Sequence, residues 1–242
     1  MNLAIDIGNT RVKVAVFNDE KLLHTQAYEK FEEKDVKFLF KRFSIQHSIL
    51  SAVSSYEDSV SAFLATNSKV VILDTKTPLP IKIFYKTPLT LGKDRIAAVA
   101  GAVALFPKEN VLVLDAGTAI THEFINAEGE YLGGGISPGI RLRFKALNAY
   151  TSHLPLIEPE NIDYLTGRST KESILSGVMN GIRFEIEGII KEYSEKYSEL
   201  KVLMTGGDAP AFETTLKSKI FAVPNLVLTG LNKILQHNVS LR

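Results

Sequence analysis

The stretch Asn2-Leu-Ala-Ile-Asp-Ile-Gly-Asn-Thr-Arg-Val-Lys-Val-Ala-Val-Phe17 decides the fold. Residues 2–7 form a short apolar run, and residues 11–17 alternate with three valines on one face. The Gly8-Asn9 pair between the two runs is typical of a hairpin turn. The sequence therefore predicts two antiparallel strands joined by a turn that carries Asp6, Asn9 and Thr10.

The same turn recurs in the second half of the chain, as Asp115-Ala-Gly-Thr-Ala119. It follows an apolar run and precedes another, as the first turn does. Glycine lets the backbone bend tightly and lets a ligand approach, and consecutive N–H groups bind anions. One such turn is equally well explained as a plain hairpin capped by Asp6. Two turns at corresponding positions indicate a pair of phosphate loops, with a cation beside each carboxylate.

The remaining periodicity has the same order in both halves, and it predicts an α/β fold of two similar lobes, 1–107 and 108–242, with a nucleotide cleft between them. In the first lobe the expected strands are Asn2–Ile7, Arg11–Phe17, Lys21–Tyr28, Ser48–Val53 and Val70–Asp74, and the expected helices are Glu32–Phe43, Tyr56–Ala65 and Asp94–Phe106. In the second lobe the expected strands are Val111–Asp115, Ala119–Ile125, Glu130–Leu132, Lys201–Thr205 and Ile220–Val223, and the expected helices are Ile140–Tyr150, Thr170–Tyr197, Pro210–Lys217 and Leu231–His237.

The amino-acid composition excludes several kinds of site and partner. The 242 residues include no cysteine, which excludes disulfides, thiolate metal sites and thiol nucleophiles. The 28 basic and 27 acidic residues leave a net charge of +1, so we expect no nucleic-acid partner. The most apolar stretch, Ile96–Phe106, is about half of the ~20 residues that a membrane span needs. No export signal is visible, and we expect a cytoplasmic protein with no membrane partner.

Two further glycine-rich stretches are predicted to be turns that lead into helices, Gly133–Gly139 and Thr205–Asp208. Bare backbone of this kind lets a phosphate or a flat ring lie against the main chain, although tight loop geometry explains each of them nearly as well. The P-loop and the Rossmann fingerprint are both absent.

The segment Gly92-Lys93-Asp94-Arg95 opens a predicted helix after a connector that contains three prolines. A helix N-terminus favours the ionised form of Asp94, and the planar fork of Arg95 suits a carboxylate. A base beside a carboxylate clamp fits a small hydroxy acid. A helix cap with a solvated arginine is an equally good interpretation of these residues alone.

Ser169-Thr170-Lys171-Glu172 matches a capping box, which explains Ser169 and leaves Thr170 free to meet a ligand. Gly177 and Gly181 in the helix that follows permit the close approach of another helix, in a dimer or in the core. The five histidines have no metal-ligand spacing on one element, and His122 is expected to be structural.

Six of these motifs occur together and in order, and the chain resembles the type III pantothenate kinase family of the acetate and sugar kinase/Hsp70/actin superfamily. They are Asp6–Thr10, Gly92–Arg95, Asp115–Ala119, Gly133–Gly139, Thr166–Thr170 and Thr205–Gly207. The resemblance implies two actin-like, ribonuclease H-like lobes, each with a mixed five-stranded sheet. Two places depart from the family pattern: Ala98, where many members carry asparagine, and His122-Glu123 after the second loop.

The resemblance also implies binding residues for ATP and cations. The residues expected to contact ATP are Asp6, Ile7, Gly8, Asn9, Thr10, Arg11, Val12, Lys13, Thr118, Thr205, Gly206 and Gly207. Asp115 is implied to bind a monovalent cation, K⁺ or NH₄⁺. Mg²⁺ is expected to bridge the phosphates, with Asp6 acting through its water shell.

For the acceptor, the resemblance implies a pantothenate site made of Tyr85, Gly92, Lys93, Asp94, Arg95 and Thr170, with Asp94 as the proton acceptor. It also implies a homodimer with pantothenate near the subunit interface. The predicted function is ATP-dependent phosphorylation of pantothenate, the first step of coenzyme A biosynthesis. Two alternatives are a kinase of another small hydroxy acid and a non-catalytic, nucleotide-binding transcription accessory protein of the same fold.

Overall fold

A computed structural model describes residues 1–241, which form two compact units. Unit one contains residues 1–108 and 128–132 together with the chain from Asn225 onward. Unit two contains Glu109–Ala127 and Gly133–Pro224. The two units are therefore not simple halves of the sequence, because the last helix groups with the first unit. None of the helices within residues 1–241 is both long and apolar enough to cross a membrane.

Unit one is built on a five-stranded mixed sheet with the order β3-β2-β1-β4-β5. The strands are β1 (Asn2–Ile7), β2 (Val12–Asn18), β3 (Lys21–Tyr28), β4 (His47–Ala52) and β5 (Lys69–Ile72). β1 pairs antiparallel with β2 and parallel with β4, so it lies at the centre of the sheet. The predicted strands and their connecting hairpin are confirmed, within a few residues at each end.

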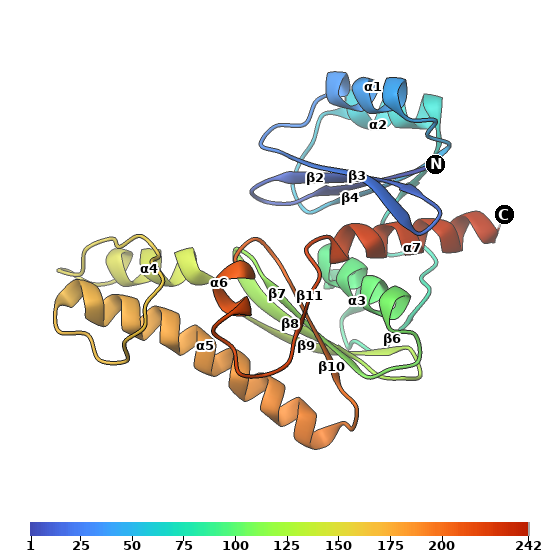
Figure 1. The fold of residues 1–242 in the computed structure, drawn as a ribbon. Helices are drawn as coiled ribbons and strands as arrows, with labels where there is room; N and C mark the ends of the chain where they lie inside the picture. Colours follow the sequence, from blue (N-terminus) through green and yellow to red (C-terminus); the bar gives the residue numbers. More distant parts are fainter. Residues whose placement is uncertain (242) are drawn as a thin grey trace. The chain divides into compact units, whose positions relative to one another are not determined.

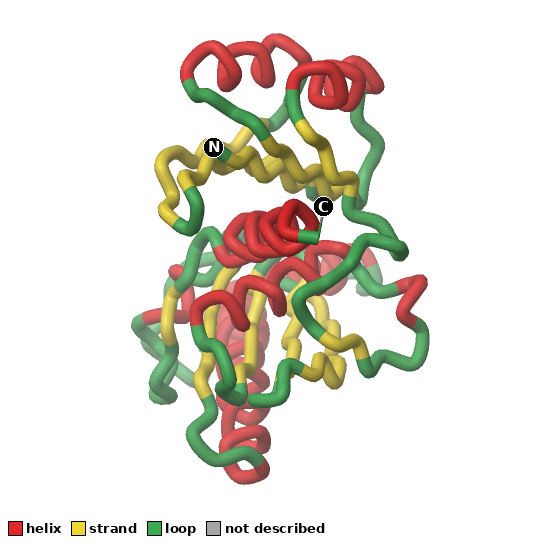
Figure 2. Tube along the Cα trace, turned by 90° about the vertical axis from the view of Figure 1, so that its right-hand side faces the viewer, coloured by secondary structure: helices red, strands yellow, loops and turns green. Residues whose placement is uncertain are grey.

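Helices cover both faces of this sheet (Figures 1 and 2). α1 (Glu33–Arg42) and α2 (Asp58–Asn67) lie on one face, and their buried residues Val36, Leu39, Val60 and Leu64 share a core with Ile5 and Leu50 of the sheet. α7 (Leu226–Ser240) covers the other face, where Asn232 accepts a hydrogen bond from Asn2 at 2.9 Å. Because side chains alternate along β1, one set packs against α1 and α2 and the other set faces α7.

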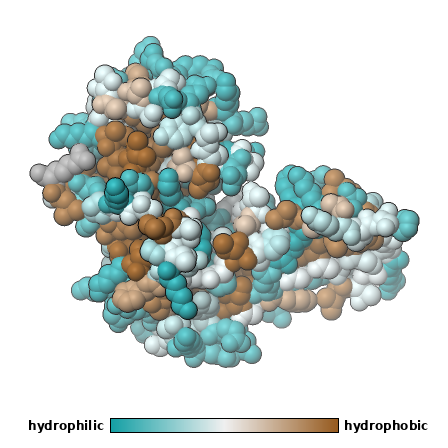
Figure 3. Space-filling view, turned by 180° about the vertical axis from the view of Figure 1, so that it is seen from behind, coloured by the Kyte–Doolittle hydropathy of each residue, from teal (hydrophilic) through white to brown (hydrophobic). Residues whose placement is uncertain are grey.

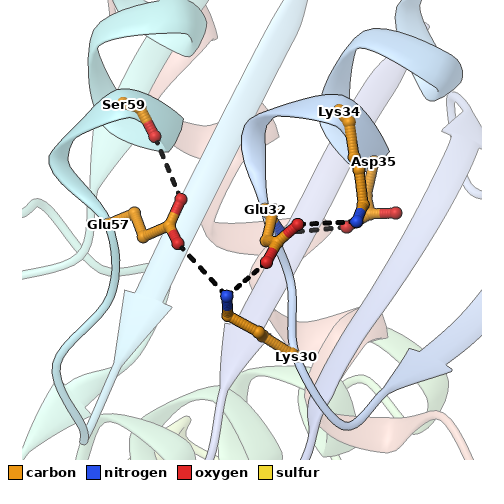
Figure 4. A network of polar contacts seen from close by, with 6 residues as sticks. All are labelled: Lys30, Glu32, Lys34, Asp35, Glu57 and Ser59. Atoms are coloured by element: carbon orange, nitrogen blue, oxygen red, sulfur yellow. Dashed lines mark hydrogen bonds and ion pairs between the residues drawn. The ribbon is translucent and has the colours of Figure 1, made fainter.

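The N-terminal ends of α1 and α2 are linked by a surface network of charges (Figure 4). Lys30 forms ion pairs with Glu32 and, at 3.8 Å, with Glu57, while Lys34 pairs with Glu32 at 2.7 Å. Hydrogen bonds from the two lysines lower the pKa of Glu32 to about 2. The backbone N–H of Glu32 donates to Asp35 at 2.9 Å, which satisfies one N–H group at the start of α1.

The C-terminal helix packs closely on α3 (Lys93–Leu105) through two glycines. A Cβ on Gly230 would lie 1.7 Å from the carbonyl oxygen of Ala97, and a Cβ on Gly101 would lie 2.4 Å from that of Leu226. Only glycine at both positions lets the two backbones approach this closely. Ala98, the departure from the family pattern, is buried in the same helix α3.

The second sheet has six strands in the order β11-β10-β7-β8-β9-β6. They are β6 (Lys82–Ile83), β7 (Val111–Ala116), β8 (Ala119–Ile125), β9 (Glu130–Pro138), β10 (Lys201–Thr205) and β11 (Phe221–Ala222). Apart from β6, the strand order repeats that of the first sheet, which confirms the duplicated fold. The sixth strand was not expected. It comes from the proline-bearing connector, pairs with the first residues of β9, and is followed by a short 3-10 helix, Pro88–Thr90.

The long helix of unit two, α5 (Thr170–Lys196), carries a buried stripe of Ile174, Val178, Ile182, Ile186 and Ile190 against the core of that unit. α4 (Ile140–Ala149) packs on α5, and the short α6 (Pro210–Glu213) contributes Phe212 to the same core (Figure 1). The helix predicted at Pro210–Lys217 is shorter than expected and ends at Glu213. The helix predicted at Leu231–His237 is longer than expected and spans Leu226–Ser240.

The prediction of a glycine-rich turn at Gly133–Gly139 was wrong, because β9 continues through it to Pro138. The glycines allow close approach between strand backbones, since a Cβ on Gly134 would lie 1.6 Å from the carbonyl oxygen of His122. A Cβ on Gly135 would in turn lie 2.4 Å from the His122 ring, which contacts Tyr193. His122 therefore has a packing role, as expected.

The glycine contact between α3 and α7 generates a stability prediction. Gly230→Ala should lower the free energy of unfolding by at least about 2 kcal/mol, because the added methyl group overlaps the backbone of α3. Gly188→Ala in α5 is the matched control, since nothing lies within 4 Å of its Cβ position. The control should be neutral or more stable, because alanine is the better helix former. Urea unfolding measures both variants, and equal stabilities would contradict the contact.

Candidate functional site

The first candidate loop is the turn between β1 and β2. The N–H of Gly8 donates to the carbonyl of Arg11 at 3.1 Å, which closes the turn and leaves Asn9, Thr10 and Arg11 exposed at its tip. The Ser54 hydroxyl donates to the Gly8 carbonyl at 3.0 Å and holds the turn from the side of β4. Sequence reasoning missed Ser54, whose only signal is its position just after the end of a predicted strand.

Asp6 and Lys13 lie opposite each other on β1 and β2. Paired residues of neighbouring strands point to the same face, so the carboxylate and the ammonium group share one side of the sheet. Both side chains are partly exposed. The flanking residues Ile7 and Val12 point the other way, into the core that α1 and α2 cover. An acidic and a basic side chain therefore lie side by side next to the turn.

The segment Gly92–Arg95 begins α3, with Gly92 as the N-cap residue. Asp94 is exposed in the first turn of the helix, where the partial positive charge of the N-terminus favours a carboxylate. A Cβ on Gly92 would lie 2.5 Å from Oδ1 of Asp94, so the glycine leaves room for the carboxylate to fold back. The same oxygen accepts a hydrogen bond from the backbone N–H of Arg95 at 2.9 Å.

Tyr85 and Arg95 are brought together in unit one. The guanidinium carbon of Arg95 lies 5.6 Å from the centre of the Tyr85 ring, which is a cation–π contact. The Tyr85 ring also stacks on the ring of Tyr131, with 6.2 Å between the two ring centres. Arg95 is buried, whereas the solvated arginine of the simpler interpretation would be exposed. Lys93 reaches away from this group and donates to the carbonyl of Ala52, at the end of β4, at 3.3 Å.

The second loop, Asp115–Ala119, joins β7 and β8 in unit two. In this loop the N–H of Gly117 donates to the carbonyl of Ala119 at 3.1 Å, and the exposed Thr118 lies at the tip of the turn. Gly139 lies against this loop: its N–H donates to the Thr118 carbonyl at 3.1 Å, and a Cβ there would lie 2.3 Å from the Gly117 carbonyl oxygen. Only glycine fits at position 139, where its backbone packs against the loop and holds it in place.

The third loop, Thr205–Asp208, follows β10 and lies beside the second. Thr205 is paired with Asp115 across the parallel strands β10 and β7. Gly206 has a φ of +102°, and a Cβ on it would lie 2.3 Å from the carbonyl oxygen of Ala116. Asp208 donates its backbone N–H to the same carbonyl at 2.8 Å, and burial raises the pKa of its side chain, an effect that Arg141 opposes.

Thr170 is the first residue of α5 in unit two. Ser169 caps α5 by accepting from the N–H of Glu172 at 3.2 Å, and Glu172 accepts from the N–H of Arg168 at 2.6 Å. The predicted cap is confirmed, and Thr170 remains exposed beside it. It lines an open groove of about 1220 Å³ between α4 and α5, whose other walls include Leu142, Tyr150 and Gly177.

Two large apolar side chains that line this groove are exposed, Leu142 and Tyr150, the latter at 89%. Other exposed apolar side chains of unit two are Ile136, Leu156, Leu165 and Phe184. One face of the molecule shows apolar residues in patches among polar ones (Figure 3).

Within residues 1–241 no group of three or more acidic or histidine side chains stands together as a metal site. The two loops instead offer one carboxylate each, Asp6 and Asp115, both partly exposed. Magnesium in proteins is commonly held by one or two carboxylates together with substrate phosphates, so this donor set fits a metal that binds with a nucleotide.

The comparisons with known proteins identify the family of the chain. The family model described as type III pantothenate kinase matches residues 2–192. A type III pantothenate kinase of Cytophaga hutchinsonii is 47% identical over 239 residues, covering 99% of this chain and 100% of the relative. Another from Christiangramia forsetii is 46% identical over 244 residues, covering 98% and 99%.

Solved structures share the fold at low identity. A conserved Campylobacter jejuni protein assigned to the Baf family of transcriptional activators aligns with a TM-score of 0.61 and 23% identity, covering 98% of this chain and 99% of that one. A ROK family glucokinase from Streptomyces griseus, solved with glucose and AMPPNP, aligns with a TM-score of 0.50 and 10% identity, covering 98% and 99%. Both likenesses concern the fold alone.

The neighbouring glycines of the third loop generate a prediction. Gly206→Ala should lower the free energy of unfolding by about 2 kcal/mol or more, because alanine both disfavours a positive φ and overlaps the Ala116 backbone. Gly207→Ala is the matched control, because nothing lies within 4 Å of its Cβ position. Urea unfolding of the two variants decides the matter, and a Gly206→Ala protein as stable as the control would refute the contact.

Proposed function

This chain belongs to the type III pantothenate kinase family, and we propose that it transfers the γ-phosphoryl group of ATP to the primary hydroxyl of pantothenate, the first step of coenzyme A biosynthesis. One observation supports this most directly. Asp6 and Asp115 occupy the same position in two sheets whose strand orders match apart from β6, each beside a tight glycine turn. The motif beginning at Gly92 then supplies a carboxylate for an alcohol substrate.

We propose that the first loop binds the ATP phosphates. Backbone N–H groups at the exposed tip, together with the Thr10 hydroxyl and the Lys13 ammonium, neutralise their charge. Phosphoryl transfer depends mainly on positioning and on this neutralisation. Ile7, Gly8, Asn9, Arg11 and Val12 complete the loop. The closed turn and its support from Ser54 favour this role, because a preformed loop need not be ordered on binding.

The second and third loops are proposed to bind the rest of the nucleotide. Thr118 contacts the phosphates from the exposed tip of its turn, and Thr205, Gly206 and Gly207 lie beside the adenosine. The backbone contacts of Gly139 and Gly206 support this assignment, because they pack both loops against neighbouring backbone. The chain-order lobes 1–107 and 108–242 then each carry one phosphate loop, although the last helix packs in unit one.

Two cations fit the carboxylates of the loops. Mg²⁺ neutralises the phosphate charge when bound, and Asp6 would hold it through its water shell. Asp115 would hold a monovalent cation, K⁺ or NH₄⁺. Carboxylate and carbonyl oxygens are the ligands that such hard cations prefer, and the second loop offers both.

Pantothenate is proposed to bind at Tyr85, Gly92, Lys93, Asp94, Arg95 and Thr170. Asp94 orients the primary hydroxyl, whose oxygen forms a bond to the γ-phosphorus while the bond from that phosphorus to the ADP oxygen breaks. The hydroxyl proton passes to the Asp94 carboxylate. The exposure of Asp94 in the first turn of α3 supports this role, because an accessible carboxylate can accept a proton late in the reaction. Arg95 is proposed to fix the carboxylate of pantothenate.

We also propose a homodimer that buries the groove between α4 and α5, with pantothenate near the interface. The apolar residues exposed there and the presence of Thr170 on the groove wall support this arrangement. Gly177 and Gly181 have nothing within 4 Å of their Cβ positions, so they leave a smooth helix surface for a partner helix. We expect the enzyme to work in the cytoplasm, where its substrate ATP is available.

The alternatives are weaker. A non-catalytic transcription accessory protein would be expected to lack one of the three aspartates, whereas Asp6, Asp94 and Asp115 are all present. The structural likeness to the Campylobacter jejuni protein concerns the fold and does not favour regulation over catalysis. A kinase of another small hydroxy acid would keep the same loops and differ only in its acceptor.

A coupled ADP-release assay tests the proposal directly. The purified protein should release ADP when pantothenate, ATP, Mg²⁺ and K⁺ are all present, and replacing K⁺ with Na⁺ should lower the rate. Turnover only with a different hydroxy acid would favour the other kinase. ATP binding without turnover on any acceptor would favour the accessory protein.

In the same assay, Asp94→Asn should lower kcat by roughly 100-fold or more, the usual contribution of a general base. Asp58→Asn is the matched control, because Asp58 also stands in the first turn of a helix, α2, and loses the same interaction with the helix N-terminus. The control should keep its activity. Near-normal turnover by Asp94→Asn would exclude Asp94 as the proton acceptor.

A charged residue introduced into the groove between α4 and α5 tests the proposed dimer. Leu142→Glu should convert a dimer into a monomer of about half its mass in sedimentation experiments, since a buried unpaired carboxylate is costly. Phe38→Glu is the matched control: Phe38 is a half-exposed apolar residue on α1 of unit one, outside the groove. A dimer that persists in Leu142→Glu, or is lost in Phe38→Glu, would assign the interface elsewhere.

A further inference from the structure

Strand β4 places Ser51 directly beside Asp6. The parallel pairing of β1 and β4 joins Asp6 to Ser51, just as the antiparallel pairing of β1 and β2 joins Asp6 to Lys13. Paired residues on neighbouring strands share a face of the sheet. Lys13, Asp6 and Ser51 therefore form one row across three strands, which we name the polar row.

The polar row lies on the face opposite the core of α1 and α2. Residues one step before it on each strand, Ile5 and Leu50, belong to that core, and so does Val14 next to Lys13. Since successive side chains alternate, the row points to the other face, the one that α7 covers (Figure 1). Ser51 is the member of the row that neither motif nor family resemblance identified.

The hydroxyl of Ser51 is buried and unused. The residue has no exposed surface, and within residues 1–241 its hydroxyl oxygen has no hydrogen-bond partner. Buried hydroxyl groups are nearly always bonded, because an unpaired one loses its contacts with water and gains nothing in return. Ser48 on the same strand shows the ordinary arrangement: it is equally buried, and its hydroxyl lies 2.6 Å from that of Ser68.

The second sheet repeats the polar row with a hydroxyl at the same place. There Asp115 is paired with Thr121 on β8 and with Thr205 on β10, in the same directions as the pairs of Asp6. Thr205, which is also buried, is one of the residues proposed to lie beside the nucleotide. Both aspartates thus have a buried hydroxyl residue next to them on the parallel neighbour strand.

Residues at the end of β4 also form hydrogen bonds with residues that are proposed to bind ATP or pantothenate. The N–H of Val53 donates to the Ile7 carbonyl at 3.0 Å, Ser54 bonds to Gly8, and Lys93 bonds to Ala52. A residue at this place is held in register with the first loop by its neighbours on either side. The backbone of Ser51 is therefore held next to the first loop.

We propose that Ser51 is a positioning residue of the first phosphate loop, whose hydroxyl forms its hydrogen bond when the nucleotide is bound. The hydroxyl then donates to the Asp6 carboxylate, or to a water which that carboxylate orders, and holds Asp6 in its working orientation. This inference rests on the proposed binding of ATP by the first loop. It does not depend on which alcohol accepts the phosphoryl group.

The test is Ser51→Ala, measured both without and with nucleotide. The free protein should unfold in urea at the same denaturant concentration as the wild type or a higher one, because the change removes an unpaired buried hydroxyl. Its affinity for a non-hydrolysable ATP analogue with Mg²⁺, measured by calorimetry, should fall roughly 10-fold, the scale of one hydrogen bond to a charged group. The KM for pantothenate should stay unchanged.

Ser48→Ala is the matched control, because it removes an equally buried hydroxyl from the same strand that does have a partner. It should lower the stability of the free protein and leave the affinity for the analogue unchanged. Wild-type affinity in Ser51→Ala would overturn the proposal, and so would a loss of stability equal to that of Ser48→Ala. If the wild-type protein binds the analogue but does not phosphorylate pantothenate, the proposed function fails while the result for Ser51 still stands.

Discussion

The register of the central strand in each sheet is the constraint on which the candidate site depends. β1 and β7 each pair with an antiparallel strand on one side and a parallel strand on the other. This pairing puts Asp6 and Asp115 next to the turn that follows each strand and brings polar side chains of both neighbours beside them. A slip of one residue would turn every side chain of the strand to the opposite face and bury the carboxylate in the core.

Close backbone contacts then hold the loops that the register has placed. Gly139 rests on the second loop and Gly206 on the backbone of Ala116, and any larger residue would collide with a carbonyl group there. In unit one the corresponding support is polar, from Ser54 to Gly8. Loops supported in these ways would lose little freedom on binding a ligand, which suits the proposed binding of phosphate by backbone N–H groups and few charged side chains.

The position of the proposed base depends on the far end of the chain. Asp94 stands on the first turn of α3, and α3 is packed on α7 through Gly101 and Gly230. α7 in turn is bonded to the first sheet through Asn232, which contacts both Asn2 and the carbonyl of Asp19. The C-terminal helix thus links the segment proposed to bind the acceptor to the strands that carry the first loop, all within one compact unit.

The resemblance to the family depended on six motifs that occur in order. Local pattern was enough to predict the strands around Asp6 and Asp115, the duplicated order of elements and the helix cap at Ser169. Each of these depends on the alternation of side chains, on turn residues or on capping residues that are neighbours in sequence. The glycines at 133–135 show the limit of local pattern, because glycine permits a turn and a closely packed strand equally well. Only the contact with His122 on the neighbouring strand decides between them.

The sequence by itself determined which residues are available for chemistry: two aspartate–glycine turns, a carboxylate at the start of a helix, and no thiol. Only the tertiary structure decided which of them stand together. It placed Ser51 beside Asp6, buried Arg95 against Tyr85 and grouped the last helix with the first unit. The reason is physical: strand register and helix packing join residues far apart in the chain, and no local preference of those residues specifies the partner.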